Sequence, residues 1–351
     1  MPKKRDPALS AANVFYMLLV VFIHVSAECV SGYIVGSVPF YPAAAAHRIV
    51  TVAVQGFIFL AGLKFVLSAG RNGFSLPRYY LSRLKRIVLP YLFAFAAFYA
   101  CYALSGRIEP SVSGAVREFF TGGLTAHFYF VAVIVQFTLL APLWILVGRR
   151  ASVSLTLFVS LFLTLIFMDH MPEFISLATS GKYWFTYNDR LFTSYLFYWI
   201  AGMTAGRNPE GFGRFLDNRR RAITVLWICG AAVDIALYTA IKTDFYYPIW
   251  ADDFHLFVST LAVLTVLSHA RKHRDAPLFR SPVFETADRA SYLVYLWHPM
   301  AILLLDGVMN RAEAASLTLR FLVRFLLTAP LSVGLCVLWQ KISARIRKGA
   351  A

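Results

Sequence analysis

Ionisable side chains stand inside stretches of this sequence that are otherwise almost wholly apolar. His24 lies in NVFYMLLVVFIHVSAE, and Glu28 follows it four residues later. Polar groups in such stretches are costly unless they are paired or functional. On a helix, Glu28 would share a face with His24, where a carboxylate can orient an imidazole and raise its basicity. The spacing predicts either a general base at His24 or a buried structural histidine.

A second histidine, His298, stands in the apolar stretch SYLVYLWHPMAILLLD, directly before Pro299. Proline has no backbone N–H and loosens a helix. Irregular turns inside a membrane bundle line either protein or a water-filled cavity. Asp306 follows His298 eight residues later, on roughly the same helix face. The pattern predicts either a functional histidine or a packing histidine at a kink.

Clustered arginines form the third kind of candidate. RYYLSRLKRIVLPYL places Arg83 and Arg86 one helical turn apart. Guanidinium forks suit phosphate oxygens, so a phosphate-bearing cytosolic cofactor could dock there. Such clusters also anchor helices to anionic lipid head groups.

Asp234, Arg320 and Arg324 fall inside other apolar stretches, where structural ion pairs between helices are at least as well supported as a catalytic role.

The composition determines which elements must position these groups. The 351 residues are 59% hydrophobic and 15% charged, with a mean hydropathy of +0.62. Average soluble domains carry about 25% charged residues, so disorder is excluded and a soluble enzyme is disfavoured. We expect an all-α fold, a polytopic integral membrane helical bundle that forms a single domain over 1–351. About ten stretches are long and apolar enough to span a bilayer: 9–28, 48–68, 88–105, 127–147, 152–169, 191–206, 222–242, 253–269, 291–309 and 317–340.

The basic residues predict the orientation of these spans. Most of the 34 Lys and Arg fall in alternate loops, which the positive-inside rule assigns to the cytoplasm together with both termini. We therefore expect a multi-pass protein of the cell (plasma or inner) membrane, in contact with membrane lipid. The net charge of +16 does not indicate nucleic-acid binding, because the basic residues form short clusters between apolar runs. The four cysteines and the histidines show no metal-ligand spacing, so no metal is expected.

A phosphate-binding inner face and a histidine toward the outer leaflet suggest group transfer across the bilayer. A large, water-soluble acyl thioester would stay inside, and its acyl group would pass to an acceptor hydroxyl outside. The imidazole would either deprotonate the hydroxyl or carry the acyl group covalently, and the residues leave both routes open.

Five segments resemble the acyltransferase-3 family of integral membrane acyltransferases, in its ten-helix form, over nearly the whole chain. They are NVFYMLLVVFIH, QGFIFLAGLKF, RYYLSRLKRIVLPYL, HFYFVAVIVQFTLLAPL and SYLVYLWHP. The chain departs from the family patterns in three places: Asn13 stands at the usual basic position, Ala61 replaces Ser, and Thr138 replaces Tyr. Family members O-acetylate or O-succinylate bacterial surface polysaccharides, lipopolysaccharide O-antigens and lipid-linked sugars.

The resemblance implies a role for His24 in catalysis and for the inner arginines in binding acyl-CoA phosphates. It also leaves open that Lys64 supplies the charge missing at Asn13. Combined with the residue patterns, it gives the following candidates. The catalytic candidates are His24, Glu28 and His298; the acyl-CoA-binding candidates are Arg83, Arg86, Lys64 and Tyr91; the substrate-binding candidates are Asn13, His127, Gln136, Ser291 and Tyr295.

The expected function is that of a membrane-bound O-acyltransferase. It would move an acyl group, in the first place acetyl, from cytosolic acyl-CoA to a hydroxyl of an extracytoplasmic or lipid-linked glycan. Two alternatives share the membrane bundle: a transporter or flippase of a lipid-linked glycan, and a non-catalytic scaffold of a polysaccharide synthesis complex. The absence of a visible internal repeat disfavours the transporter.

Overall fold

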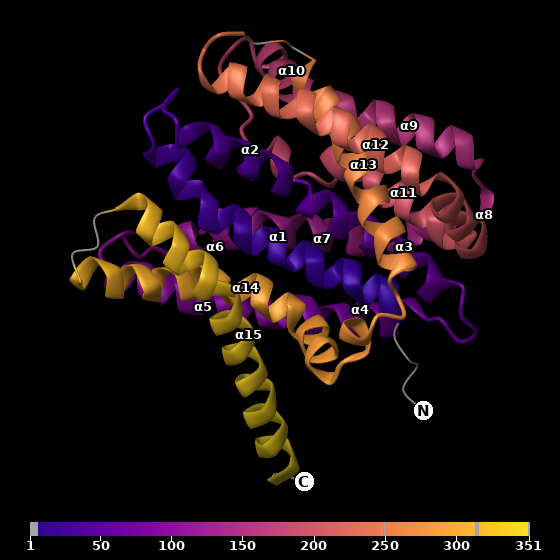
Figure 1. Ribbon diagram of the computed structural model, residues 1–351. Helices are drawn as coiled ribbons and strands as arrows, with labels where there is room; N and C mark the ends of the chain where they lie inside the picture. Colours follow the sequence, from indigo (N-terminus) through magenta and orange to yellow (C-terminus); the bar gives the residue numbers. More distant parts are fainter. Residues whose placement is uncertain (1–5, 247, 249, 313–315, 350–351) are drawn as a thin grey trace. The chain divides into compact units, whose positions relative to one another are not determined.

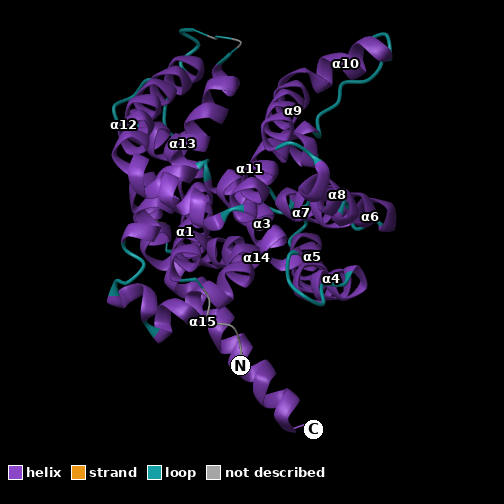
Figure 2. Ribbon diagram, turned by 90° about the vertical axis from the view of Figure 1, so that its right-hand side faces the viewer, coloured by secondary structure: helices purple, strands orange, loops and turns teal. Residues whose placement is uncertain are grey.

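Helices make up the regular structure of the chain. The computed structural model describes residues 6–246, 248, 250–312 and 316–349, except for the side chains of Asp169 and residues 340–349. Figures 1 and 2 show helices joined by loops, without a strand among the described residues, which confirms the all-α prediction. The α-helices are α1 Pro7–Gly32, α2 Phe40–Val50, α3 Ala53–Ala69, α4 Leu76–Arg83, α5 Leu89–Leu104, α6 Val112–Thr121, α7 Tyr129–Leu139, α8 Ala141–Arg150, α9 Val153–Leu165, α10 Met171–Ala178, α11 Leu196–Arg207, α12 Pro209–Lys242, α13 Ala251–Lys272, α14 Pro282–Arg311 and α15 Leu317–Gly349.

Shorter helical segments join several of these helices. The π-helical turns are η1 Leu84–Val88 and η2 Ile166–His170, and the 3-10 turns are η3 Asn188–Arg190, η4 Phe192–Tyr195 and η5 Pro277–Arg280. π-helical turns occur frequently at functional sites. η1 carries Lys85 and Arg86 of the predicted cofactor segment, so the backbone is irregular where that segment meets α5.

Seven helices of the described chain are long and apolar enough to cross a membrane, and two bent helix pairs raise the number to nine if each is one span. The sequence predicted about ten. The difference includes the stretch 191–206, which forms the 3-10 turn η4 and most of the 12-residue helix α11. At about 1.5 Å per residue, α11 is about 18 Å long, well short of a hydrocarbon core of about 30 Å. Most of α11 is buried inside the protein.

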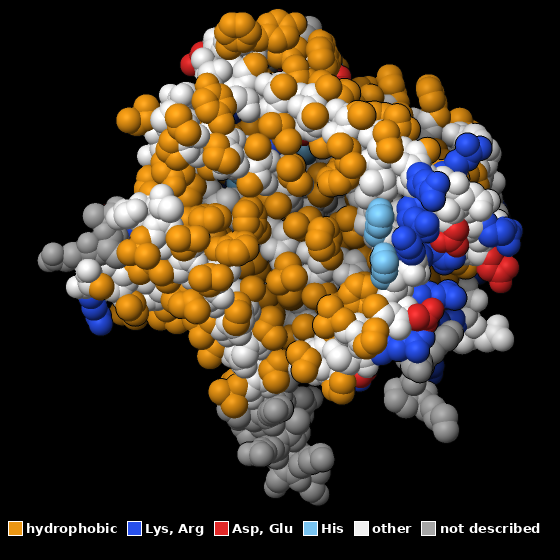
Figure 3. Space-filling model, in the orientation of Figure 1, with side chains coloured by type: hydrophobic (Ala, Val, Ile, Leu, Met, Phe, Trp, Pro, Cys, Tyr) orange, Lys and Arg blue, Asp and Glu red, His pale blue; other side chains and the backbone are white. Residues whose placement is uncertain are grey.

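Basic side chains gather at one end of the face drawn in Figure 3, and the rest of that face is largely apolar. In the first unit, the first half of α12 carries Arg214, Arg219 and Arg220, and the last turn of α13 carries Arg271 and Lys272. Lys and Arg gathered at the ends of apolar helices are typical of membrane proteins whose cytoplasmic loops carry these residues. Residues 1–5 and 350–351 lie outside the described residues, so the cytoplasmic placement of the termini stays a prediction.

The helices form two compact units, one of Met1–Phe57 with Gly213–Ala351 and the other of Ile58–Phe212. The single domain over 1–351 that the sequence predicts stays a prediction. In the first unit α1 packs against α2, α13, α14 and α15. Helix α1 begins at Pro7, directly after Asp6, whose side chain accepts a hydrogen bond from the Ala8 N–H and caps the helix.

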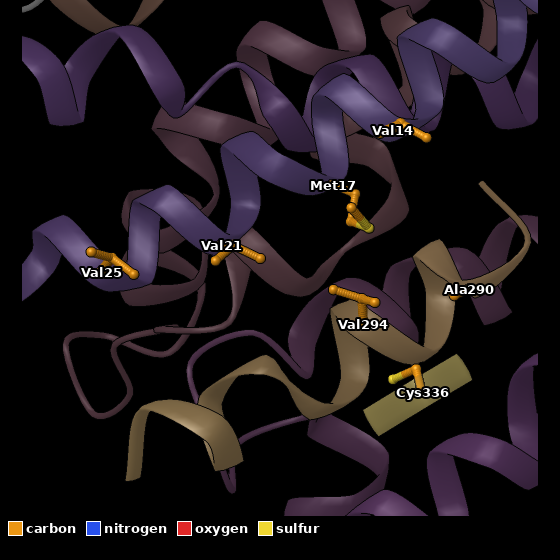
Figure 4. Close-up of a cluster of buried hydrophobic side chains, with 7 residues drawn as sticks. All are labelled: Val14, Met17, Val21, Val25, Ala290, Val294 and Cys336. Carbon is orange, nitrogen blue, oxygen red and sulfur yellow. The ribbon is translucent and has the colours of Figure 1, made fainter. Parts of the chain in front are cut away.

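One buried apolar cluster sets the register of α1 against α14 (Figure 4). The side chains contributed by α1 recur every three or four residues, the spacing that places them on one helix face. The members are Val14, Met17, Val21 and Val25 of α1, Ala290 and Val294 of α14, and Cys336 of α15. His24 lies between the last two members from α1, and His298 lies four residues after Val294. Both histidines therefore lie next to residues of this cluster, where α1 packs against α14.

In the second unit, α3 and α11 approach so closely that their backbones touch at glycines. A Cβ atom added at Gly62 would collide with the Trp199 carbonyl, and one added at Gly202 would collide with the Phe59 carbonyl. Small residues at such crossings allow membrane helices to pack by close van der Waals contact. Because the obstructing atoms belong to the backbone, the neighbouring helix must move to admit a side chain.

Gly202→Ala is therefore expected to destabilise the protein by about 1–3 kcal/mol, the usual cost of overpacking. The matched control is Gly334→Ala in α15, where no heavy atom of the described residues lies within 4 Å of the added Cβ. Thermal unfolding of the purified full-length protein in detergent should show a lower Tm for the first variant and not for the second. Equal Tm values for both variants would contradict the close crossing.

Candidate active site

The structure brings the two predicted histidines together. The rings of His24 on α1 and His298 on α14 have their centroids 5.0 Å apart, at an interplanar angle of 49°. His298 is fully buried, whereas His24 is partly exposed. The two imidazoles are separated by 274 positions in the sequence, so this contact is a product of the packing of α1 against α14. Of the two residues, only His24 keeps part of its surface accessible.

The backbone around Pro299 determines which ring nitrogen of His298 carries the proton. In a regular helix the N–H at position 299 would bond to the carbonyl of Tyr295, and proline has no N–H to donate. His298 Nδ1 lies 2.8 Å from that carbonyl oxygen and 3.2 Å from the carbonyl oxygen of Val294. A carbonyl only accepts hydrogen bonds, so Nδ1 carries the proton and donates. In the neutral ring, Nε2 then holds the lone pair.

A polar contact joins α1 and α14 on one side of the histidine pair. Ser10 Oγ donates to Asp288 Oδ2 at 2.8 Å, and Asn13 Nδ2 donates to Asp288 Oδ1, also at 2.8 Å. Asp288 is only 7% exposed. Asn13, predicted to bind substrate, is thus engaged with a buried carboxylate of its own chain. Asp288 was not among the sequence candidates; its position on the His298 helix, ten residues earlier, was the available signal.

Charged residues join α1, α14 and α15 on the other side of the pair. Arg324 binds Asp306 through Nε at 2.7 Å and Nη2 at 2.6 Å, and its Nη1 binds Glu28. Arg324 is only 5% exposed. Glu28, predicted to orient His24, is thus held by a guanidinium, and its predicted catalytic role stays a prediction. The sequence prediction of ion pairs between helices is confirmed for Arg324.

These two polar contacts lie on either side of the histidines along the same helices. On α1 the order is Asn13, His24, Glu28, and on α14 it is Asp288, His298, Asp306. Together with the apolar cluster, the polar contacts prevent the helices from sliding. A slip of one residue would turn each histidine by about 100° around its helix axis and separate the rings. The arrangement can therefore hold one imidazole against another in a fixed geometry, as acid–base chemistry requires.

Two further candidates lie on α14. Ser291 is 4% exposed and its hydroxyl donates to the Ala287 carbonyl at 3.0 Å. Tyr295 is also buried, and its ring stacks on Tyr292 and lies near the His298 ring, with centroids 6.1 and 6.4 Å away. Both side chains are buried, and only Tyr295 is shown near His298. Their predicted contact with substrate stays a prediction.

In the second unit, Arg83 lies beside an apolar groove. The groove has a volume of about 460 Å³ and is lined by Tyr80, Leu81, Arg83, Leu84, Ile87, Val88, Val135, Thr138 and Leu139. The guanidinium of Arg83 stands over the ring of Tyr79, with its carbon 4.9 Å from the centroid. Arg86 is exposed on η1. Arg83 therefore ends α4, and Arg86 lies in the π-helical turn that directly follows it.

The remaining candidates of the second unit lie in different surroundings. Tyr91 is buried, and its hydroxyl donates to the Phe119 carbonyl at 2.8 Å. His127 is buried next to Phe128, with Nδ1 2.6 Å from Thr125 Oγ1. Gln136 braces the segment before α11, because its amide donates to the Arg190 carbonyl and accepts from the Phe192 N–H. Lys64 is exposed on α3.

A further cluster of polar side chains surrounds the buried Asp234 of α12. Arg48 of α2 binds its carboxylate with two parallel hydrogen bonds of 2.9 and 2.8 Å, and His255 Nδ1 lies 2.8 Å from Oδ2. Ser259 Oγ lies 3.2 Å from His255 Nε2, an order of groups that resembles a nucleophilic triad. Ser259 is fully buried, however, and Arg48 already occupies both carboxylate oxygens. The group joins α2, α12 and α13 as a structural ion pair.

Neither unit gathers a cluster of His, Cys, Asp and Glu suited to a metal ion among the residues that the structure describes. The acyltransferase-3 family, described as an acyltransferase domain, matches residues 7–339. Comparison with curated proteins and with solved structures found no match.

Proposed function

The chain belongs to the acyltransferase-3 family, and from that premise we propose that it is a membrane-bound O-acyltransferase acting on a glycan. The donor is a cytosolic acyl-CoA, with acetyl as the transferred group. The acceptor is a hydroxyl of an extracytoplasmic or lipid-linked sugar. The observation that carries the proposal is the His24–His298 pair, a partly exposed imidazole backed by a buried one between two membrane helices.

His24 acts as the general base in this proposal. It takes the proton from the acceptor hydroxyl as the oxygen attacks the thioester carbonyl; the C–S bond then breaks, and the proton passes to the departing thiolate. The products are the O-acyl sugar and free CoA thiol. His298 is a positioning residue: its Nδ1–H is committed to the Tyr295 carbonyl, so its ring is fixed against His24.

The donor side of the proposal rests on η1 and its neighbours. CoA carries phosphate groups, and arginine forks are suited to them. Arg83 is the last residue of α4, and Arg86 lies in the π-helical turn that follows. Arg86 is exposed, which leaves its guanidinium available to an anionic ligand. We assign these two residues to the phosphates of acyl-CoA.

Two measurements test the function. Surface glycans from cells with and without the gene are compared by mass spectrometry, and we expect an acyl group, identified by its mass, to be lost with the gene. The purified full-length protein is then given acetyl-CoA and the unacylated glycan, and release of free CoA thiol is followed. Identical glycans from both cells, with no thiol released, would exclude the proposed reaction.

A further inference from the structure

Arg320 differs from its neighbour Arg324 in how its donors are used. The Nη1 atom of Arg320 donates to Asn310 Oδ1 at 2.7 Å. Its Nε lies 3.6 Å from Glu28 Oε1, and its Nη2 lies 3.7 Å from Asp306 Oδ1, both beyond hydrogen-bond distance. Nε is buried and makes no hydrogen bond within the described part of the chain. Arg324, one turn further along α15, bonds through all three of its nitrogens.

The two donors that Arg320 leaves unused form one edge of the guanidinium. Nε–H and one Nη2–H point in parallel, and this edge is the fork that binds a carboxylate or phosphate with two hydrogen bonds. Leaving the buried Nε–H without an acceptor is energetically unfavourable. A fork in that state is suited to an anionic ligand that brings its own oxygens.

The fork lies close to the proposed reaction centre. Glu28, which Arg320 approaches, is four residues from His24 on α1, about 6 Å along the helix axis. Asp306, its other neighbour, follows His298 on α14. By the charge distribution of the loops, this end of the helices is the outer one, from which the acceptor would arrive.

Glu28 is the natural competitor for the fork. Its side chain is 37% exposed, and its second oxygen, Oε2, is held by Arg324. With Arg324 holding Oε2, the loose contact between Oε1 and Arg320 can open without releasing the glutamate. An incoming anion then replaces two loose contacts, one with Glu28 and one with Asp306, by two short, charge-assisted hydrogen bonds.

We propose that Arg320 binds an anionic group of the acceptor, a carboxylate or a phosphate, and so places a nearby sugar hydroxyl at His24. The proposal rests on the proposed function and narrows its acceptor to anionic glycans. A carboxylate would belong to an acidic sugar, whereas a phosphate would belong to a phosphorylated sugar or a lipid carrier. The chemistry of the fork is the same for both.

Binding is measured on the full-length protein in nanodiscs of zwitterionic lipid, without acyl donor. The probes are methyl glucuronide for the carboxylate, glucose 1-phosphate for the phosphate and methyl glucoside as the neutral control. We expect at least one anionic probe to bind the wild type about tenfold more tightly than the glucoside, as charge-assisted hydrogen bonds imply. The probe that is preferred identifies the source of the anion.

The variants separate the fork from simple charge. Arg320→Gln should abolish the preference, and Arg320→Lys, which keeps the charge without the fork, should lower it several-fold. Glu28→Gln, which removes the competitor, should tighten binding. Arg311→Gln, at an exposed arginine ending α14, is the matched control and should change affinity less than twofold. If Arg320→Gln does not fold, Arg320→Lys carries the test.

No preference for either anionic probe would overturn the proposal, as would a preference that survives in both Arg320 variants or weaker binding by Glu28→Gln. Acyl transfer is measured in parallel on the same preparations. Transfer by the wild type without any anion preference refutes the Arg320 site alone. An anion preference that depends on Arg320, found without transfer, leaves the site standing and refutes the proposed function.

Discussion

His24→Ala is expected to lower kcat/KM for acyl transfer by about 10²–10⁴-fold, the usual contribution of a general base. The variant removes the accessible ring of the histidine pair, while the apolar cluster and the polar contacts on either side of it remain. We therefore expect a Tm close to that of the wild type. The measurements are release of CoA thiol in the presence of acceptor and thermal unfolding of the same preparation.

Two further variants make the His24 result interpretable. His24→Gln keeps much of the side-chain volume and should be as inactive as His24→Ala, which separates lost chemistry from lost packing. His273→Ala, at an exposed histidine just after α13, is the matched control and should transfer normally. Transfer at the wild-type rate by both His24 variants would remove this residue from the mechanism.

Arg324→Met is expected to destabilise the protein by up to about 3–5 kcal/mol, because it removes the buried partner of two ion pairs. Arg324 is the buried cation between Glu28 and Asp306, and without it two carboxylates face each other across α1 and α14. Arg320 approaches both carboxylates at distances too long for hydrogen bonds, so it does not replace Arg324. The free energy of unfolding and the Tm of the purified protein measure the loss.

A triple variant and a surface control test this explanation. Adding Glu28→Gln and Asp306→Asn to Arg324→Met removes the uncompensated charges and should recover most of the lost stability. Arg289→Met breaks an exposed pair with Glu285 on α14 and should cost about 1 kcal/mol or less. An unchanged Tm for Arg324→Met, or a triple variant less stable than the single one, would show that the buried ion pair does not hold these helices together.

The helices were predictable wherever an apolar run was long. α1, α13 and α14 carry predicted spans because about twenty apolar residues in succession have few alternatives to a helix in lipid. The stretch 191–206 was predicted as a span on composition and became the short helix α11. Composition does not distinguish a helix that faces lipid from one buried in protein. The glycine crossing between α11 and α3 and the 3-10 turns before α11 depend on neighbours far away in the sequence.

Some residues of the candidate site were also predictable from the sequence, and others were identified only by the structure. His24 and His298 were found from sequence because an imidazole in an apolar stretch is costly, and that cost is local. Asp288 escaped notice, since its importance comes from Ser10 and Asn13 on another helix. Asp234 was noticed as a buried charge, but only the structure identified Arg48 and His255 as its partners.

The amino-acid sequence by itself determined that this chain is an all-helical membrane protein, where its longest apolar helices lie, and that His24, His298, Asp234 and Arg324 are polar residues in apolar surroundings. Those properties follow from hydropathy and from the backbone's need to satisfy its own hydrogen bonds, both of which act over a few turns. Only the tertiary structure decided that His24 meets His298, that Pro299 leaves the Tyr295 carbonyl to the His298 ring, and that Arg324 joins Glu28 to Asp306. The pairings of His24 with His298 and of Arg324 with Glu28 and Asp306 depend on the rotation and register of helices packed side by side, which no single helix encodes.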